Sequence, residues 1–191
     1  MKFFKGALVT LLGLFGCAPK FVDTTVQGVP NIVQYAPDMW RMGQPADEGA
    51  WDYVRFQMEK SGKPILIVKL NDDNEGKDEP MLGFAGWTLS KNAIPPEDDK
   101  PWTVFVKPDP NEVTAIVKLI VWAHQSGWVV AHHCTHGRDR TSLITALVGM
   151  KLFGWTKKQA WDDMIAHGFR WELPDLDAFW LENVEAKKLP K

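Results

Sequence analysis

The side chains that could carry out chemistry gather in one short stretch, VVAHHCTHGRDRTS, at residues 129–142. Small and β-branched residues lead into it and an apolar segment follows, which predicts a buried strand, a loop and a helix. Cys134 stands at the start of the loop, with histidines on both sides and two arginines after it. These residue types allow three roles for the sulfur: a metal ligand, an inert core thiol or a nucleophile.

A loop that enters a helix N-terminus directs backbone N–H groups at one spot, where the helix dipole also favours an anion. Gly137 lets the loop curl so that these donors converge, and Arg140 offers a planar fork for two phosphate oxygens. The same field favours the thiolate form of Cys134 and makes it a nucleophile. We expect His133 to orient the loop and support the sulfur, and Thr141 to donate its hydroxyl when the sulfur leaves. All these groups serve one reaction, which is hydrolysis of a phosphate monoester through a phosphocysteine.

The segment HCTHGRDRTS matches the signature of the cysteine-dependent protein tyrosine phosphatase superfamily: His-Cys, five residues, Arg, then Ser or Thr. VPNIVQYAPDMWRMGQP, ILIVKLNDD and TKKQAWDDMIAHGFRW also resemble bacterial and plant members of dual-specificity type, so the resemblance covers most of residues 29–188. It implies that Cys134 is the nucleophile, that Arg140 clamps the phosphate and that Thr141 assists turnover. It also implies that the phosphate binds to the loop residues Thr135, His136, Gly137, Arg138, Asp139 and Arg140.

The leaving alkoxide needs a proton, which these enzymes usually take from an Asp on a movable loop. By resemblance this loop lies between the FAGWTLS segment and the next helix, where Asp98, Asp99 and Asp109 occur. At the spacing that PTP-like phytases use, this sequence has no Asp. The stretch GRDRT also resembles the GKDRT of bacterial lipid-type phosphatases, in which the Asp before the Arg is the proposed acid. Asp99 and Asp139 are therefore equal candidates, followed by Asp98 and then Asp109.

The resemblance to PTP-like phytases favours an inositol polyphosphatase, with inositol hexakisphosphate as its small-molecule substrate. Arg138 adds a cation beyond the clamp, and His136 adds another when it is protonated. The alternative is a protein-tyrosine or dual-specificity protein phosphatase. A phosphoinositide phosphatase comes third, and a non-catalytic module that binds phosphorylated ligands is the remaining possibility. None of these mechanisms requires a metal or another cofactor.

The other roles for the sulfur account for fewer of the residues. His132, His133, Cys134 and His136 are zinc ligand types. Adjacent strand residues face opposite sides of a sheet, however, and the sequence offers no second ligand pair at a useful spacing. We therefore expect no metal site. An inert core thiol would leave the glycine and the two arginines of the loop unexplained.

The N-terminal residues differ from the rest of the sequence. Lys2 and Lys5 precede an apolar run at residues 6–16, which is too short to cross a bilayer and fits a signal peptide better than a short buried helix. The run ends in LFGC, which resembles the lipobox of bacterial lipoproteins and implies lipidation at Cys17. Lipidation would leave Cys134 as the mature thiol, without a partner for an intrachain disulfide. We expect an exported protein held at the bacterial cell envelope by a lipid anchor.

The chain has 191 residues and a formal net charge of −2. This length allows one domain with a sizeable core, and the charge disfavours general binding to nucleic acid. We expect a signal peptide at 1–16, a tether at 17–28 and a monomeric phosphatase domain at 29–191.

Strand and helix patterns alternate within the domain, which predicts an α/β fold with a central mixed sheet flanked by helices. The phosphate-binding loop should join a central strand to an apolar helix. We expect strands on both sides of Pro37-Asp38 and at 64–70, 84–90 and 127–133, and helices at 46–61, 110–125, 141–153, 156–167 and 174–188.

Overall fold

A five-stranded mixed sheet forms the centre of the computed structural model, which describes residues 24–71, 78, 84–91, 108–171 and 174–185. The strand order is β3-β4-β7-β5-β6, in which β3 is antiparallel to β4 and the other neighbours are parallel. The strands are β3 (Val33–Ala36), β4 (Met39–Gly43), β5 (Ile65–Lys69), β6 (Trp87–Lys91) and β7 (Val129–Cys134). The predicted α/β fold with a central mixed sheet is confirmed.

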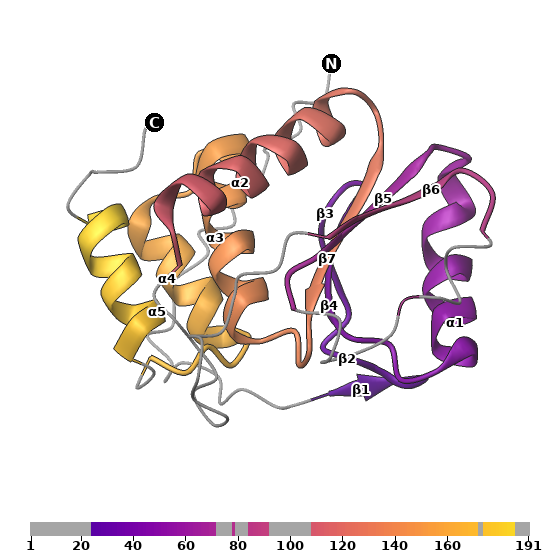
Figure 1. Cartoon of the computed structure of the whole chain (residues 1–191), viewed down its shortest axis with the longest axis horizontal. Coiled ribbons are helices and arrows are strands. Elements are labelled where there is room, and N and C mark those ends of the chain that lie inside the picture. Colours follow the sequence, from indigo (N-terminus) through magenta and orange to yellow (C-terminus); the bar gives the residue numbers. More distant parts are fainter. Residues whose placement is uncertain (1–23, 72–77, 79–83, 92–107, 172–173, 186–191) are drawn as a thin grey trace, which may run out of the picture.

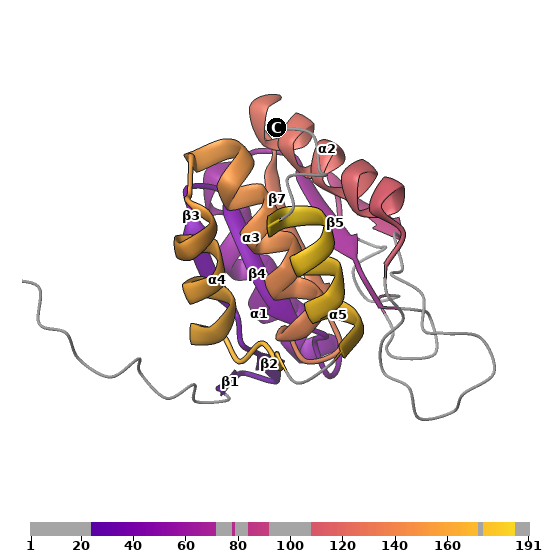
Figure 2. The same ribbon diagram turned by 90° about the vertical axis from the view of Figure 1, so that its left-hand side faces the viewer.

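Helices cover both faces of this sheet (Figure 1). On one face lies α1 (Glu48–Met58), extended by a 3-10 turn at Glu59–Ser61. The other described helices lie in front of the sheet in Figure 2. They are α2 (Pro110–Gln125), α3 (Asp139–Phe153), α4 (Lys157–Ala166) and α5 (Pro174–Phe179), the last continued by a π-helical turn at Trp180–Glu185.

Two cores follow from the alternation of side chains along each strand. On the α1 face, Val129 and Ala131 of β7 pack with Trp51 and Val54 of α1, all of them buried. On the other face, Val130 packs with residues of α2 and α3. β7 is buried along its whole length, because it lies between β4 and β5 and is covered on both sides.

Local signals explain where the helices begin and end. The Asp47 side chain accepts a hydrogen bond from the Ala50 N at 2.9 Å and caps α1, and Gly62 ends the 3-10 turn in the left-handed region at φ 65°. Pro110 occupies the first turn of α2, where a missing N–H costs nothing. Thr156 and Gln159 form a reciprocal capping box at the start of α4. These boundaries agree with the sequence analysis to within a few residues.

Two details differ from the sequence analysis. A hairpin of β1 (Thr25–Val26) and β2 (Val29–Pro30) begins inside the range assigned to the tether, so part of 17–28 is folded. Helix α3 begins at Asp139 and not at Thr141, which places two predicted loop residues in its first turn. The predicted signal peptide lies outside the described residues, as do the last residues of the predicted C-terminal helix. No helix in the described part of the chain is long and apolar enough to cross a membrane.

The strand register brings the functional residues to one edge of the sheet. Gly43 at the end of β4 lies opposite Cys134 at the end of β7, and Lys69 at the end of β5 lies opposite His133. Parallel strands therefore deliver three chain segments to the place where β7 passes into the loop and α3. This is the edge of an open α/β sheet at which ligands characteristically bind.

Candidate active site

Cys134 is the last residue of β7, and its sulfur lies beneath the loop that enters α3. The Thr141 Oγ1 donates a hydrogen bond to the Cys134 Sγ at 3.1 Å. The cysteine is unpaired and buried, with 5% of its surface exposed. Because Thr141 stands in the first turn of α3, the sulfur also faces the positive end of that helix dipole. The structure thus places a hydroxyl donor and a helix N-terminus at the sulfur.

Three successive carbonyl groups of the loop are held from outside by the N-terminal part of the domain. The Thr135 O accepts from the Gln44 N at 3.0 Å, and the His136 O accepts from the Asn31 Nδ2 at 2.8 Å. The Gly137 O accepts from the Arg41 Nη2 at 2.9 Å. We call these donors, Asn31, Arg41 and Gln44, the carbonyl clamp.

The clamp determines the direction of the loop's N–H groups. In a trans peptide the C=O and the following N–H point in opposite directions. Holding each carbonyl from outside the loop therefore leaves the N–H of the next residue directed to the inside, as a phosphate cradle requires.

Arg41 is the charged member of the clamp, and its side chain is completely buried. Besides the loop carbonyl, it donates to the Ser142 Oγ at 2.6 Å and lies 3.4 Å from the Asp163 Oδ2. Burial lowers the pKa of Arg41 to about 10, with Asp163 and Cys134 opposing this shift. Arg41 therefore remains charged at neutral pH and contributes a positive charge behind the loop.

Gly137 allows the loop to approach β4 closely. Its φ is 71°, in the region that favours glycine. A Cβ atom at Gly137 would lie 2.5 Å from the Gly43 N and 2.6 Å from the Met42 C, closer than van der Waals contact permits. The glycine predicted from the sequence to let the loop curl thus has a second role, because the backbones of the loop and β4 pack directly against each other.

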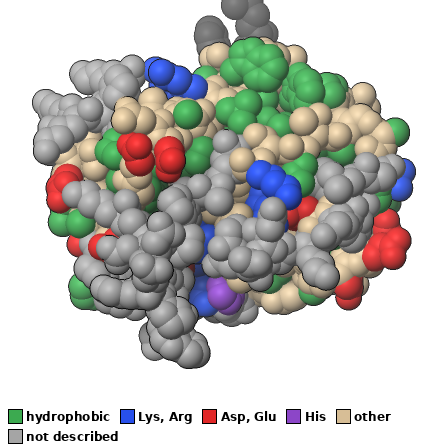
Figure 3. All heavy atoms as spheres, in the orientation of Figure 1, with side chains coloured by type: hydrophobic (Ala, Val, Ile, Leu, Met, Phe, Trp, Pro, Cys, Tyr) green, Lys and Arg blue, Asp and Glu red, His purple; other side chains and the backbone are tan. Residues whose placement is uncertain are grey.

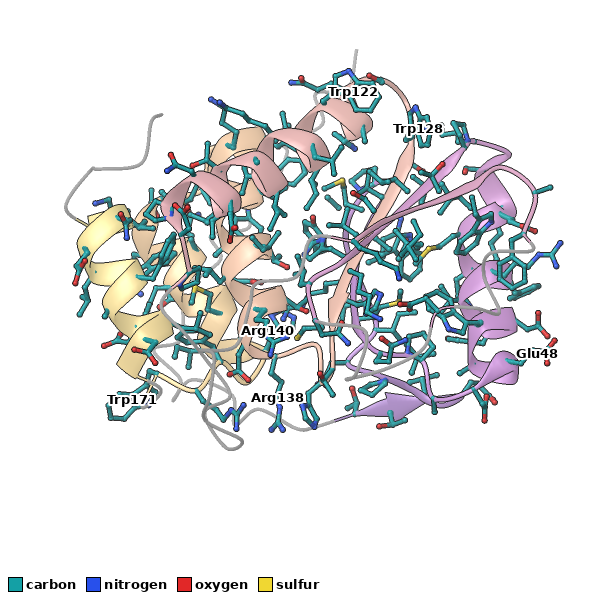
Figure 4. All side chains as sticks on the ribbon, in the orientation of Figure 1. Glu48, Trp122, Trp128, Arg138, Arg140 and Trp171 are labelled. Carbon is teal, nitrogen blue, oxygen red and sulfur yellow. The ribbon has the colours of Figure 1, made fainter. Side chains whose placement is uncertain are left out.

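The predicted phosphate clamp, Arg140, lies in the first turn of α3 with 3% of its surface exposed. Its Nη1 donates to the Leu70 O at 3.3 Å, just beyond the end of β5. A buried guanidinium fixed at one nitrogen keeps a constant position relative to the loop. Figure 4 shows Arg140 and Arg138 at the end of the sheet where β7 leads into α3, with Trp122 and Trp128 at the opposite end.

The two histidines before Cys134 face opposite sides of the sheet, as strand alternation predicts. His132 shares a hydrogen bond with the Thr145 Oγ1 at 2.8 Å, whereas His133 packs edge-on against Trp51 of α1. Burial lowers the pKa of His132 to about 3 and that of His133 to about 4. Both imidazoles are therefore neutral at pH 7. Within the described residues no three His, Cys, Asp or Glu side chains gather into a metal site.

Asp139 has a partner that the sequence analysis missed. Its carboxylate accepts hydrogen bonds from the backbone N of Arg170 at 3.1 Å and from the Arg170 Nη2 at 2.6 Å, and the Arg170 Nε lies within 3.3 Å of both oxygens. Asp109 caps α2 and accepts from the Asn111 N at 2.8 Å. Asp98 and Asp99 lie outside the described residues.

The structure also brings charged residues to the site that the sequence analysis did not consider. Lys69 and Asp78 form an ion pair at 2.8 Å with both side chains buried, and the Asp78 Oδ1 lies 3.4 Å from the His133 Nε2. The available signal was a single charge in an apolar strand: Lys69 ends ILIVK, and Arg41 lies within MWRMG. Lys and Arg are rarely buried without a partner, so a charge in such a position indicates a buried partner elsewhere in the chain.

Comparison with known proteins tests the superfamily resemblance. No protein-family model matches the chain. The dual specificity protein phosphatase TpbA of Pseudomonas aeruginosa is 25% identical over 139 residues, which are 73% of this chain and 55% of TpbA. The chain thus spans about half the length of this curated relative. The crystal structure of P. aeruginosa TpbA superimposes with a TM-score of 0.64 at 20% identity, covering 90% of this chain and 96% of that one. The chain has the fold and the signature loop of the cysteine-dependent protein tyrosine phosphatase superfamily.

Other solved structures of this superfamily share the fold. TpbA in complex with phosphotyrosine superimposes with a TM-score of 0.64 at 19% identity, covering 90% of this chain and 96% of that chain. The core catalytic domain of the PP-IP phosphatase SIW14 from S. cerevisiae superimposes with a TM-score of 0.55 at 10% identity, covering 82% of this chain and 90% of that one. The relatives are phosphatases, in agreement with the activity predicted from the sequence. The finer prediction of a phytase is not supported by these names and stays a prediction.

The surface next to the loop is basic. His136 is exposed and Arg138 is half-buried. Figure 3 shows Lys, Arg and His atoms on the lower part of the face it displays, near where Figure 4 labels Arg138 and Arg140 in the same orientation. Such positive side chains favour substrates that carry negative charge.

Proposed function

We propose that the protein is a cysteine-dependent phosphomonoester hydrolase that acts on phosphotyrosine-containing proteins or peptides. The observation that carries the proposal is the hydrogen bond from the Thr141 hydroxyl to the Cys134 sulfur at the N-terminus of α3, beneath a loop whose carbonyls are held outward. A nucleophile, an anion cradle and a donor for the departing sulfur thereby occupy one place.

The reaction proceeds in two steps. The Cys134 thiolate attacks phosphorus, the bond to the ester oxygen breaks, and the leaving oxygen takes a proton from the general acid. The loop N–H groups and Arg140 hold the three phosphoryl oxygens throughout. Water then attacks the phosphocysteine and gives a proton to the carboxylate that the general acid became in the first step, the S–P bond breaks and inorganic phosphate leaves. Thr141 stabilises the returning thiolate through its hydrogen bond.

Phosphotyrosine is the preferred class because the curated relative is a dual specificity protein phosphatase and because a TpbA structure holds phosphotyrosine. A phenolate is also a better leaving group than an alkoxide, so its departure depends less on proton donation.

Inositol polyphosphates are the second candidate class. The exposed His136 and the half-buried Arg138 flank the loop and could contact additional phosphates of the same molecule. SIW14, a PP-IP phosphatase, shares the fold at low identity. Inositol hexakisphosphate therefore belongs in the same substrate panel.

Phosphate release should be measured with phosphotyrosine peptides, phosphoserine peptides, phosphoinositides and inositol hexakisphosphate. We expect the phosphotyrosine peptides to give the highest kcat/KM, and Cys134→Ser to lower it by at least about 1,000-fold. Full activity in Cys134→Ser would refute the phosphocysteine. Turnover of inositol hexakisphosphate in preference to every peptide would favour the second candidate. Tight binding of phosphopeptides without turnover would instead favour a ligand-binding module.

The general acid is proposed to be Asp99, with Asp98 next, because Asp139 is held by Arg170. Asp99→Asn should lower kcat far more for an alkyl phosphate than for an aryl phosphate, since only the alkoxide needs full protonation. Asp139→Asn should lower kcat by the same factor for the alkyl phosphate and the aryl phosphate. The opposite pattern would make Asp139 the acid.

Export and lipidation are also proposals. If residues 1–16 are a signal peptide, mass spectrometry of the protein from a bacterial envelope fraction should find Cys17 as a lipid-modified N-terminus. An unprocessed N-terminus in that fraction would contradict this.

A further inference from the structure

We propose that Lys69 and Asp78 form a positioning pair for the nucleophile: the Asp78 carboxylate orients Gln44 and His133 behind Cys134, and the Lys69 ammonium holds that carboxylate and balances its charge. This inference rests on the proposed function, and it assigns a role to residues that do not touch the substrate.

The geometry of the pair is the first argument. The Lys69 Nζ and the Asp78 Oδ2 are 2.8 Å apart, with 1% and 3% of their side-chain surfaces exposed. The other carboxylate oxygen, Oδ1, accepts from the Gln44 Nε2 at 2.9 Å and lies 3.4 Å from the His133 Nε2. One carboxylate thus contacts a lysine, an amide and an imidazole, all of them buried.

The connections of these groups to the loop are the second argument. The Gln44 N donates to the Thr135 O, so the residue that Asp78 holds by its side chain holds the loop by its backbone. The Gln44 Oε1 accepts from the Asn71 Nδ2 at 3.3 Å, and the neighbouring Leu70 O accepts from Arg140. The pair therefore lies where the chain segments that position the loop and the phosphate clamp meet.

The cost of the arrangement is the third argument. Two buried charges gain little net stability over apolar side chains of similar volume. Apolar residues occupy the equivalent positions along the same face of β5, where Ile65 and Ile67 precede Lys69. A pair that stability does not require, placed against the residue before the proposed nucleophile, therefore indicates a role in the site.

Opposite charges next to His133, the residue before Cys134, give the pair a testable signature. Among the described residues, the charged or titratable groups that act on His133 are Asp78, Lys69 and the neighbouring His132, whereas Cys134 acts through its backbone and α1 presents the uncharged Trp51. Lys69→Met leaves a negative charge behind the sulfur, which opposes the thiolate. Asp78→Asn leaves a positive charge, which favours it. A purely structural pair would give two variants with the same defect.

The experiment measures alkylation of Cys134 by iodoacetamide as a function of pH in the full chain, with the labelled peptide quantified by mass spectrometry. We expect the pH midpoint to rise in Lys69→Met and to fall in Asp78→Asn, each by up to about one pH unit, as for a single nearby charge at an effective dielectric of about 20. Lys69→Arg should keep the midpoint. The midpoint of kcat/KM for phosphate release should move in the same directions.

The matched control is the exposed pair Lys63–Asp38, 2.6 Å apart, which joins the starts of β5 and β4 at the other edge of the sheet. Lys63→Met and Asp38→Asn should leave the alkylation midpoint unchanged. If Lys69→Met does not fold, the double variant Lys69→Met/Asp78→Asn should restore the midpoint that Asp78→Asn lowers.

Shifts in the same direction, or no shift in a folded variant, would overturn the proposal. A double variant that keeps the shift of Asp78→Asn would also overturn it. Alkylation does not require turnover, so the two proposals can fail separately. If the wild-type protein releases no phosphate but the two variants shift the alkylation midpoint in opposite directions, the enzyme is refuted and the pair is retained. Wild-type turnover with unshifted variants would refute the pair alone.

Discussion

Arg41→Met tests whether the carbonyl clamp shapes the phosphate cradle. The substitution keeps an apolar side chain of similar length and removes the guanidinium. It thereby removes the donors to the Gly137 O at 2.9 Å and the Ser142 Oγ at 2.6 Å, and the charge that faces Asp163 at 3.4 Å. Because Arg41 is completely buried, water cannot replace these contacts without opening the fold.

Two magnitudes follow from this geometry. Removing one partner from a buried charged network costs about 3–5 kcal/mol of the free energy of unfolding, which corresponds to a fall in Tm of about 6–20 °C for a domain of this size. Separately, the Gly137 carbonyl loses its donor, at a cost of about 1–3 kcal/mol while it stays buried and unpaired. Rotating that peptide relieves the cost but turns the following N–H out of the cradle. Loss of one such donor lowers kcat by about 100- to 1,000-fold.

The assays are urea unfolding and phosphate release below the melting temperature of the variant. Arg55→Met is the matched control, because Arg55 of α1 forms an exposed ion pair at 3.0 Å with Glu59 of the following 3-10 turn, worth about 0.3–0.5 kcal/mol. Arg41→Lys keeps the charge without the planar guanidinium. Its free energy of unfolding and its kcat should lie between those of Arg41→Met and wild type. An Arg41→Met protein that is destabilised yet fully active would refute the cradle argument. One that is as stable as wild type would refute the energetic argument as well.

Three further outcomes test other parts of the site. Thr141→Val removes the donor to the Cys134 sulfur, so burst kinetics should show the phosphocysteine accumulating while steady-state kcat falls about 10- to 100-fold; an unchanged kcat would contradict this role. Gly137→Ala should abolish phosphate release and destabilise the fold by more than about 1 kcal/mol, measured by urea unfolding, because its Cβ would meet the β4 backbone. The free energy of unfolding should fall as the pH drops from 6.5 towards 4, since burial lowers the pKa values of His132 and His133 to about 3 and 4 and the unfolded chain then binds more protons. At pH 4.5 the proton that each histidine binds only in the unfolded chain lowers the free energy of unfolding by roughly 2–3 kcal/mol. His132→Gln should therefore flatten the pH dependence measured by urea unfolding.

The sequence was sufficient to predict the elements that position the site. Alternation, apolar runs and helix caps predicted the central strands and the helices, because these signals depend on neighbours within one element. The spacing from Cys134 to Arg140 likewise predicted a loop and a helix N-terminus around the sulfur. The structure places Thr141 against that sulfur because strand, loop and first helical turn are contiguous in the chain.

The hairpin formed by residues 25–30 was missed for a physical reason. Its strands are only two residues each, too short for a periodic pattern, and it turns through Gln27 and Gly28 at positive φ. Short hairpins depend on turn geometry and on packing against the rest of the domain, which here includes the β2–β4 contact. Neither the turn geometry nor this packing can be read from the residues of a single strand.

The residues that hold the loop were missed because each of them acts across a long stretch of chain. Asn31 reaches His136, Gln44 reaches Asp78, and Asp78 reaches His133. Strand register determines such meetings, and register cannot be read from the residues near Cys134 alone.

Asp139 shows how the same limit affects an inference about mechanism. From the sequence it was an acid between two arginines, and its position resembled that of a proton donor. In the fold, Arg170 from the segment after α4 reaches both carboxylate oxygens, and the backbone N of Arg170 adds another hydrogen bond. A carboxylate that accepts hydrogen bonds from a guanidinium at both oxygens loses at least one of those contacts if it takes part in proton transfer. The structure therefore makes Asp139 a brace between α3 and the chain after α4, which supports the proposal that Asp99, in the segment before α2, is the proton donor.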